Sequence, residues 1–266
     1  MDYTFIPKSL SDDEKSKLEQ QNSRLVPDYK ANDLEKNAKK YWDLFYKRNE
    51  ERFFKDRHWT TREFKELLNE KDDEEKRVIF EVGCGVGNFI FPLVEENLFS
   101  YIYACDLSPR AVEFVKKNQL YNVNTMKIFQ CDITTDDVHQ EIGKNEIDIV
   151  TLIFVLSAIH PDKFISTIRN IFELLKPGGV LLFRDYGLYD MAQIRFKAGH
   201  KIANNFYMRQ DGTRSFYFAP EYIEDIFTNV GFQIISNCYV HRRTINIKEN
   251  IDVPRIFIQS KVMKPR

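Results

Sequence analysis

Short apolar runs alternate with helical stretches between residues 78 and 187, and this rhythm limits the folds open to the chain. Runs this short, rich in β-branched and aromatic residues, are typical of strands, and strands that alternate with helices form parallel sheets. Because the runs are apolar almost throughout, the sheet is expected to be buried on both faces. The runs are "VIFEVG" (78–83), "YIYACD" (101–106), "MKIFQCD" (126–132), "IDIVTLIFVL" (147–156) and "GVLLFRDYG" (179–187), with helical patterns at 88–97, 109–119 and 162–175.

Two more strands are expected near the end of the chain. A polar and aromatic insertion at about 188–219 interrupts the rhythm, and a helix at 220–230 follows it. Strand patterns then occupy 231–241 and 254–262. The sequence therefore predicts an α/β fold with a mostly parallel, seven-stranded sheet and helices on both faces, over residues 78–266.

Residues 1–77 are expected to form a helical extension ahead of this domain. The first 33 residues look like a mobile, polar lead-in with one short helical stretch, and the charged stretch 69–77 looks like a connector. Between them, apolar side chains recur at helical spacing at Leu34, Ala38, Trp42, Phe45 and Tyr46.

A glycine-rich loop, "EVGCGVGN" (81–88), follows the first strand and opens a helix. Glycines allow a ligand to approach the backbone where a Cβ atom would clash. Asp106 ends the next strand, 19 residues after Gly87, where a carboxylate can accept hydrogen bonds from both hydroxyls of a ribose. Asp132 ends the third strand and is placed for an adenine amino group. These positions predict a site for an adenosine-containing cofactor.

Two cofactors compete for such a site. Dinucleotides favour the spacing G-x-G-x-x-G, whereas this loop has G-x-G-x-G at Gly83, Gly85 and Gly87. Glu81 would repel a pyrophosphate, but it suits a ligand that carries an ammonium and a sulfonium group. The pattern therefore favours S-adenosylmethionine over a nicotinamide cofactor, with a tight turn that binds nothing as the plain structural alternative.

Longer motifs resemble a known family. The runs "EVGCGVGN", "YACDLSPRAVE", "QCDIT", "LIFVLSAIHP" and "LKPGGVLLFRDYG" resemble class I S-adenosylmethionine-dependent methyltransferases, which have a Rossmann-like fold. The runs "WDLFYKRN", "FFKDRHWTTREF", "FRDYGLYD" and "NFYMRQDGTRSFYF" resemble the tRNA N3-methylcytidine methyltransferases, methyltransferase-like proteins 2, 6 and 8, and most closely the branch of number 6. The resemblance covers nearly the whole chain from about residue 28.

The family likeness implies an activity and partners. It implies methylation of N3 of cytidine at position 32 of the tRNA anticodon loop. For the branch of number 6 it implies serine tRNA as substrate and seryl-tRNA synthetase as a helper. Carried over by motif, its cofactor contacts fall on Trp42, Tyr46, Gly83, Asp106, Asp132, Ile133 and Ile153. We add the adjacent Gly85 and Leu107, and expect Ile133 and Ile153 to enclose the adenine.

Methylation of N3 needs little from an enzyme beyond alignment, since the ring nitrogen has a free lone pair near neutral pH. A flipped base and a dry pocket are required, and a carboxylate would stabilise the cationic product. Asp185, at the carboxyl end of the fifth strand, is our candidate, with a helix cap or a salt bridge near Arg184 as the structural alternative. Tyr186 is expected to flank the substrate pocket.

Residues 40–59 combine aromatic and cationic side chains. Trp42 and Tyr46 lie one helical turn apart and are expected to form a lid over the cofactor, because electron-rich rings attract a sulfonium. In the second half, "RFFKDRHW", we expect Arg57 and His58 near the flipped cytosine and Trp59 against tRNA. The alternative for Phe53 and Phe54 is simple packing against the domain.

A second candidate tRNA contact is a hairpin at residues 206–218. The pair Asp211–Gly212 is a strong turn signal between alternating aromatic residues. Arg209 and Arg214 bracket the turn and are expected to contact phosphates from a projecting tip. The alternative is a flap that packs on its own domain.

Charge and composition bound the remaining possibilities. Residues 78–176 have 8 basic and 13 acidic side chains. Basic side chains outnumber acidic ones at 39–65, by 9 to 5, and at 241–266, by 7 to 2. Basic ends indicate a polyanionic partner, although solvated lysines would give the same count. No apolar run can span a membrane, and the chain begins without a signal or transit pattern, so we expect a cytoplasmic, and also nuclear, monomer.

The four cysteines lack metal-ligand spacing, so no metal site is expected and the thiols are expected to be reduced and mostly buried. Two other functions stay open. One is a methyltransferase acting on another RNA, a protein or a small molecule. The other is a non-catalytic, cofactor-binding module that interacts with RNA or a synthetase.

Overall fold

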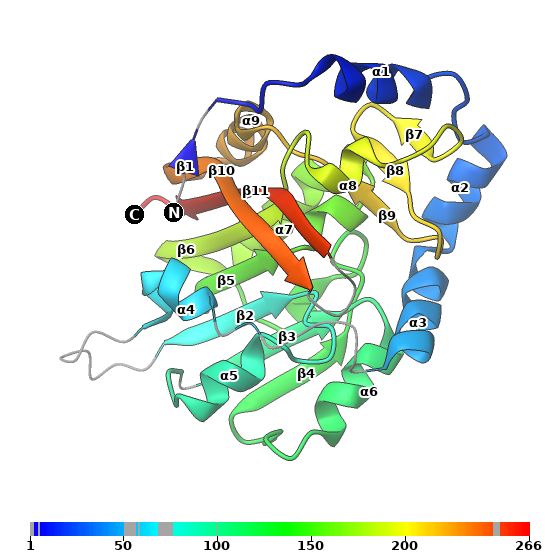
Figure 1. The fold of residues 1–266 in the computed structure, drawn as a ribbon. Helices are drawn as coiled ribbons and strands as arrows, with labels where there is room; N and C mark the ends of the chain where they lie inside the picture. The colour runs from blue at the N-terminus through cyan, green and yellow to red at the C-terminus, as the bar shows by residue number, and fades with distance from the viewer. Residues whose placement is uncertain are drawn as a thin grey trace. The chain divides into compact units, whose positions relative to one another are not determined.

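The computed structural model describes residues 3–4, 6–50, 57, 59–68, 77–99, 101–246 and 251–266 (Figure 1). The chain divides into two compact units. The first comprises Met1–Ala38, Ile153–Ile165 and Phe183–Val262, and the second comprises Lys39–Leu152, Ser166–Leu182 and Met263–Arg266. Both units draw on residues from either side of the boundary that we expected after residue 77, and that boundary stays a prediction.

Parallel strands form the centre of the second unit. Strand β2 (Val78–Val82) pairs with β3 (Tyr101–Asp106) and with β5 (Ile147–Ile153), and β3 pairs with β4 (Met126–Gln130). With the first part of β6 (Leu175–Tyr186), the order is β6-β5-β2-β3-β4. Strand order therefore reverses beside β2, and in α/β sheets ligands bind outside the carboxyl ends of the strands at such a point.

Helices of the second unit follow the expected rhythm. Serine at position 108 caps α6 (Pro109–Lys117) by accepting from the Ala111 backbone amide. Helix α5 (Ile90–Glu95) is shorter than expected, because Asn97 adopts a left-handed φ of 52° just after it. The remaining elements are α3 (Ala38–Asn49), α4 (Thr60–Glu63), α7 (Phe164–Leu174) and the 3-10 turns η1 (Lys65–Leu67) and η2 (Val138–Gln140).

The first unit contains the other edge of the large sheet and a small sheet. Its strand order is β1-β10-β11-β6, and the small sheet has the order β7-β8-β9. The large sheet has eight strands among the described residues, one more than expected, because the two-residue β1 pairs with β10. The strands are β1 (Tyr3–Thr4), β7 (Lys201–Ala203), β8 (Phe206–Met208), β9 (Arg214–Phe216), β10 (Gln233–Asn246) and β11 (Ile251–Met263). Its helices and turns are α1 (Asp12–Gln21), α2 (Asp28–Lys36), η3 (Leu156–Ala158), η4 (Pro161–Lys163), α8 (Met191–Ile194) and α9 (Pro220–Val230).

Residues 1–33 contain more helix than the one short helical stretch that we expected, because α1 lies within them and α2 begins at Asp28. Ser11 and Glu14 form a capping box at the start of α1. At its end the buried Gln21 side chain donates to the backbone carbonyl oxygens of Gln193 and Phe196 at 2.9 and 3.1 Å. This segment is held by a buried polar side chain rather than an apolar stripe, so hydrophobic periodicity could not reveal it.

The structure confirms the expected α/β fold with a mostly parallel sheet and a helical N-terminal extension. All four cysteines are buried, as expected. Within the described part of the chain, no helix combines the length and apolarity that crossing a lipid bilayer requires.

Candidate active site

The glycine loop adopts a conformation that requires glycine. Gly83, Gly85 and Gly87 have φ values of 70°, 55° and 92°. A Cβ atom at position 85 would lie 2.9 Å from the hydroxyl oxygen of Tyr46. The loop is fixed to the next strand, since the Gly85 amide donates to Asp106 Oδ2 at 2.9 Å and the Cys84 amide donates to the Cys105 carbonyl at 2.9 Å.

Asp106 lies at the carboxyl end of β3, as expected for a ribose ligand. Its carboxylate is 7% exposed and also accepts from the Ser108 amide at 2.9 Å. Burial raises the pKa of Asp106 to about 6, while these backbone hydrogen bonds lower it. The carboxylate is therefore held in one orientation beside the loop. Leu107, which follows it, is half-buried.

Asp132 and Ile133 follow the neighbouring strand β4. Asp132 accepts from the backbone amide and the hydroxyl of Thr134 at 3.0 and 2.7 Å, and its side chain is half-buried. Ile133 is buried, and its carbonyl oxygen accepts from the Asn170 side chain at 3.0 Å. A carboxylate and an apolar surface thus stand side by side where the adenine was expected. Ile153, the last residue of β5, is 2% exposed and belongs to the first unit.

The expected lid packs directly on the glycine loop. Trp42, Phe45 and Tyr46 of α3 form an apolar cluster with Val86 of the loop and Ala111 of α6. Tyr46 is 5% exposed, and its ring centroid lies 6.3 Å from that of Trp42. Burial, reinforced by the Asp106 carboxylate, raises the pKa of the Tyr46 hydroxyl. Trp42 is half-buried, so part of its ring stays accessible.

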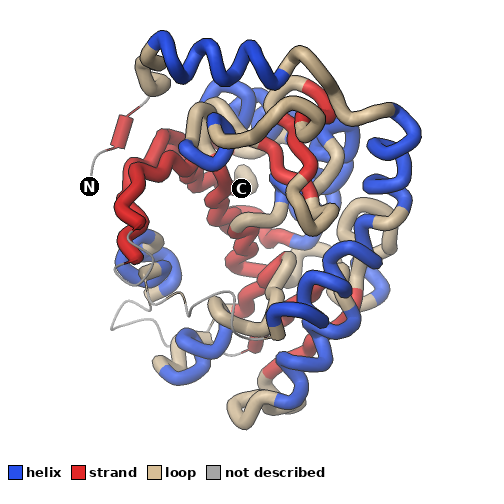
Figure 2. Tube along the Cα trace, turned by 45° about the vertical axis from the view of Figure 1, so that its right-hand side comes forward, coloured by secondary structure: helices blue, strands red, loops and turns tan. Residues whose placement is uncertain are grey.

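Asp43 attaches the lid helix to α6, and our sequence reasoning missed it. Asp43 Oδ1 accepts from the hydroxyl of Ser108 at 2.9 Å and from the amide of Arg110 at 3.2 Å. It also pairs with the Arg110 guanidinium at 3.4 Å. The carboxylate therefore occupies the N-terminus of α6, and α3 lies beside that helix (Figure 1, Figure 2). Nothing in the local pattern separates Asp43 from an exposed helical aspartate.

Glu81 supplies a buried acid beside the loop. It is 2% exposed, and among the described residues its Oε2 atom has no hydrogen-bond partner. Thr151, the residue of β5 that is paired with Glu81, also has a hydroxyl without a hydrogen-bond partner within the described part of the chain. Burial raises the pKa of Glu81 to about 8, with partial compensation by Arg57. A buried acid that lacks a donor fits a ligand ammonium group, so the cradle fits S-adenosylmethionine.

Arg57 lies near the glycine loop and Glu81. Its backbone amide donates to the Asn88 carbonyl at 2.8 Å, and its guanidinium lowers the pKa of Glu81. Trp59, just before α4, is half-buried. His58, Phe53 and Phe54 lie outside the described residues. The expected contacts of Arg57, His58 and Trp59 with cytosine and tRNA stay predictions.

In the first unit, Asp185 is completely buried at the end of β6. Its carboxylate accepts from the backbone amides of Ser157 and Tyr186, both at 2.9 Å. Burial raises the pKa of Asp185 to about 6, and hydrogen bonds from Ser157 lower it. The carboxylate is thus ionised at pH 7.5 and caps η3, as the structural alternative expected. Its catalytic role stays a prediction.

Tyr186 is surrounded by cations and rings. The guanidinium carbon of Arg209 lies 5.2 Å from the Tyr186 ring centroid, and that of Arg255 lies 6.0 Å away. The rings of Phe154 and Tyr217 are at 5.1 and 5.7 Å. Arg209 is therefore held against Tyr186 rather than at the hairpin tip.

The expected hairpin is confirmed, but its arginines do not project. Strands β8 and β9 pair antiparallel across a turn in which Gly212 has a φ of 83°. Arg214 is 5% exposed, pairs with Glu35 of α2 and donates to the Ala158 carbonyl at 3.1 Å. This arrangement favours the packed flap. The assignment of Arg209 and Arg214 to phosphate contacts stays a prediction.

Comparisons with known proteins agree with the cofactor cradle. The family model described as a methyltransferase domain matches residues 47–237. The human tRNA N(3)-cytidine methyltransferase METTL6 is 52% identical over 257 residues, which cover 96% of this chain and 90% of that protein. The tRNA N(3)-methylcytidine methyltransferase trm141 of Schizosaccharomyces pombe is 44% identical, over 88% of this chain and 95% of that protein.

The fold is also similar to a solved SAM-dependent methyltransferase from Anabaena variabilis. The TM-score is 0.61 at 15% sequence identity, over 86% of this chain and 95% of that chain. At this identity the likeness concerns the fold alone. The family model and the relatives that match along almost their whole length show that the chain belongs to the tRNA N(3)-cytidine methyltransferases, in the METTL6 branch.

Proposed function

We propose that this chain transfers the methyl group of S-adenosylmethionine to N3 of cytidine in tRNA. The observation that carries the proposal is the 52% identity to METTL6 over 96% of the chain. The geometry supports the cofactor half, because Gly85 is held to Asp106 and packed against Tyr46. Beside them, one carboxyl oxygen of Glu81 has no hydrogen-bond partner among the described residues.

Each group of the cofactor has a candidate partner. Asp106 would bind the ribose hydroxyls, Asp132 the adenine amino group and Glu81 the ammonium group. Trp42 and Tyr46 would place electron-rich rings near the sulfonium, which contributes about 0.5–2 kcal/mol where such contacts are made. When bound, the cofactor supplies an electrophilic methyl group, and the protein's task is to hold the acceptor nitrogen in line with it.

The chain needs no general base for this reaction. N3 of cytosine is unprotonated near neutral pH, so alignment and exclusion of water provide most of the rate increase. The ring becomes cationic as the bond forms. A buried carboxylate held by two backbone amides, as at Asp185, would stabilise that charge without reorganising.

The finer substrate assignment rests on the family motifs. We propose cytidine 32 of serine tRNA as the acceptor, seryl-tRNA synthetase as a partner, a monomeric protein, and the cytoplasm and nucleus as its locations. The motifs "NFYMRQDGTRSFYF" and "FRDYGLYD" support the tRNA part of this assignment.

Nucleoside mass spectrometry tests the proposal. Purified protein is incubated with S-adenosylmethionine and serine tRNA, with and without seryl-tRNA synthetase, beside a non-serine tRNA and a serine transcript with uridine at position 32. We expect 3-methylcytidine only in serine tRNA that has cytidine 32, in larger amounts with the synthetase. Absence of the product in every tRNA would refute the activity, and equal product in both tRNAs would refute the serine preference alone.

A further inference from the structure

A cleft of about 930 Å³ opens in the first unit, and none of the residues assigned above to cofactor or cytosine lines it. It is lined by residues of α1 and beside it, by Met191, by residues 194–198 and by Pro254. Neither Asp185 nor Tyr186 lines it. The cleft therefore has no role in the proposed chemistry, and its walls indicate what could occupy it.

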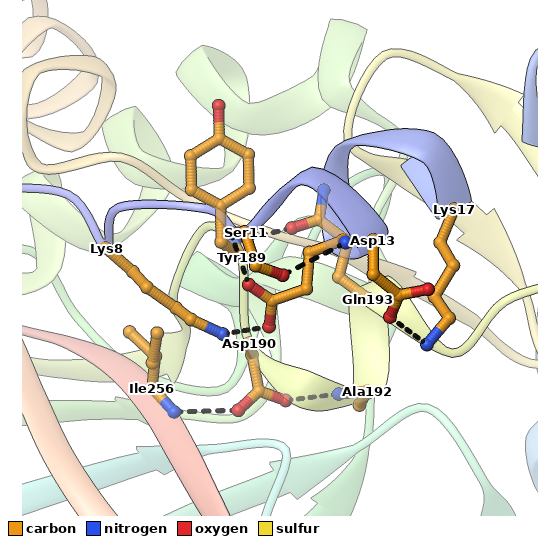
Figure 3. A network of polar contacts seen from close by, with 10 residues as sticks. Lys8, Ser11, Asp13, Lys17, Tyr189, Asp190, Ala192, Gln193 and Ile256 are labelled. Atoms are coloured by element: carbon orange, nitrogen blue, oxygen red, sulfur yellow. Dashed lines mark hydrogen bonds and ion pairs between the residues drawn. The ribbon is translucent and has the colours of Figure 1, made fainter. Parts of the chain in front are cut away.

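The walls are held by buried polar contacts. Gln21 fixes the backbone of residues 193–196 through its amide hydrogens, and the Gly199 amide donates to the Arg24 carbonyl at 2.6 Å. The fully buried Asp190 accepts from the amides of Ala192 and Ile256 at 3.0 and 2.7 Å (Figure 3). These hydrogen bonds anchor the backbone of the segment that lines the cleft.

The cleft has two uncompensated positive charges. Lys17 pairs with Asp13 at 2.6 Å, and Lys8 pairs with Glu14, so these four charges cancel (Figure 3). The remaining two cations, Arg195 and Lys197, are exposed. Their side chains have no hydrogen-bond or ion-pair partner in the described part of the chain. An anionic occupant is therefore favoured.

An aromatic ring on a buried support lies between these two cations in the sequence. Phe196 is half-buried and stacks on Tyr207 at a centroid distance of 4.7 Å and an interplanar angle of 6°. Tyr207 is 2% exposed, and its hydroxyl donates to Gln21 Oε1 at 2.9 Å. Tyr207 covers one face of Phe196, and the rings of His200 and Tyr217 lie at centroid distances of 5.8 and 6.4 Å. The part of the Phe196 side chain that stays exposed lines the cleft.

A supported ring flanked by two unpaired cations is suited to single-stranded nucleic acid, since bases stack on rings and phosphates pair with Arg and Lys. An acidic peptide would use the cations but has no need of the parallel ring stack. We propose that this cleft binds a tRNA nucleotide other than the methylated cytidine, with its base on Phe196 and the adjoining phosphates on Arg195 and Lys197. The inference depends on the proposed tRNA substrate, but not on serine tRNA or on position 32.

Three variants and one control test it in the full chain. Phe196→Leu removes the flat ring but keeps apolar volume, Phe196→Trp keeps a ring, and R195A/K197A removes both cations. The control K116A/K117A removes two exposed lysines of α6, which lies in the acidic central segment. Binding of fluorescent tRNA is measured against salt, using whichever tRNA the wild-type protein methylates best. Cofactor affinity and thermal stability are measured in parallel.

We expect Phe196→Leu and R195A/K197A each to weaken tRNA binding about 5-fold or more, as expected for one lost stacked base or two lost phosphate contacts. R195A/K197A should also reduce the slope of log K against log salt by about 1–2. Phe196→Trp and K116A/K117A should bind tRNA like the wild type, and cofactor affinity should not change in any variant. Wild-type tRNA affinity in both Phe196→Leu and R195A/K197A would overturn the proposal and leave a protein partner as the occupant. Equal losses in Phe196→Leu and Phe196→Trp would also overturn it.

Discussion

The hydroxyl oxygen of Tyr46 lies where a side chain at Gly85 would be, 2.9 Å from the position of an added Cβ atom. A residue of the N-terminal extension thus forms one wall of the glycine loop. We therefore expect cofactor binding and the placement of α3 to be coupled through the packing of Tyr46 on this loop.

Substitution of Gly85 by alanine should weaken S-adenosylmethionine binding at least 10-fold. An alanine at this position would be strained at a φ of 55° and would also collide with Tyr46. Gly178→Ala is a matched control, since Gly178 has a φ of 82° but a Cβ atom there meets its nearest neighbour, Arg266, only at 3.4 Å. Titration calorimetry should show normal affinity for Gly178→Ala and partial recovery in G85A/Y46F. Equal affinity in Gly85→Ala and Gly178→Ala would exclude the steric coupling.

Loss of the Asp43 carboxylate should loosen the lid. Asp43→Ala leaves the Ser108 hydroxyl and the Arg110 amide without this acceptor, which should cost about 1 kcal/mol of stability, as for the loss of a helix cap. Because Trp42 and Tyr46 sit on the same helix, cofactor affinity should fall too. Glu113→Gln removes an exposed charge from α6 and should change neither quantity. A normal cofactor affinity in Asp43→Ala, measured by calorimetry, would show that the lid does not need this anchor.

Cofactor affinity should depend on pH through Glu81. The pKa of this carboxyl is raised from 4.5 to about 8 in the unliganded protein, so its burial costs stability as pH rises through that range. A ligand ammonium reverses the shift, and binding should release a proton. Between pH 6.5 and 7.5 the cofactor amine is still mostly charged, and affinity should rise by up to about 10-fold. Calorimetry in buffers of different ionisation enthalpy measures the release, and Glu81→Gln should abolish it. An unchanged pH slope in that variant would assign the effect to another group.

The contact between Arg214 and Glu35 should stabilise the hairpin. Arg214→Ala removes a buried cation and leaves Glu35 with Lys163 as its ion-pair partner. The free energy of unfolding should therefore fall by about 1–3 kcal/mol. A double-mutant cycle with Glu35→Gln should give a coupling energy of about 1 kcal/mol or more. Additive effects in denaturant unfolding would show that the two side chains act independently. In that event a phosphate contact would be the better role for Arg214.

The strands and the cofactor acids were predictable because both follow local patterns. The apolar runs located β2, β3, β4 and β5, and Asp106 and Asp132 are recognisable from their positions at strand ends. The spacing of the glycines predicted the ligand-binding loop in the same way. Each of these features depends on neighbours in the sequence, which is where periodicity carries information.

Long-range polar contacts were not predictable. Asp43 meets Ser108 across 65 positions, Gln21 meets Gln193 across 172, and Arg214 meets Glu35 across 179. A buried glutamine in a polar helix looks the same in sequence as an exposed one. The hairpin arginines were expected to project for this reason, because the sequence gives no sign of the acid that holds Arg214.

Asp185→Asn should separate catalysis from structure at the end of β6. Asparagine has nearly the same shape, and its side-chain oxygen can still accept one backbone hydrogen bond, but its charge is gone. If the carboxylate stabilises the cationic ring, the single-turnover rate with bound tRNA should fall by about 100-fold or more, while tRNA and cofactor affinities stay within about 3-fold. Below pH 6 the wild-type rate should fall toward that of the variant, because the pKa of Asp185 is about 6 and its carboxylate becomes protonated. Ser157→Ala keeps the backbone amide that Asp185 accepts from but removes the hydroxyl that lowers the pKa of the carboxyl, so the fall in rate should move to higher pH. A near-normal rate in Asp185→Asn, with a lowered melting temperature, would leave Asp185 as the cap of η3 alone.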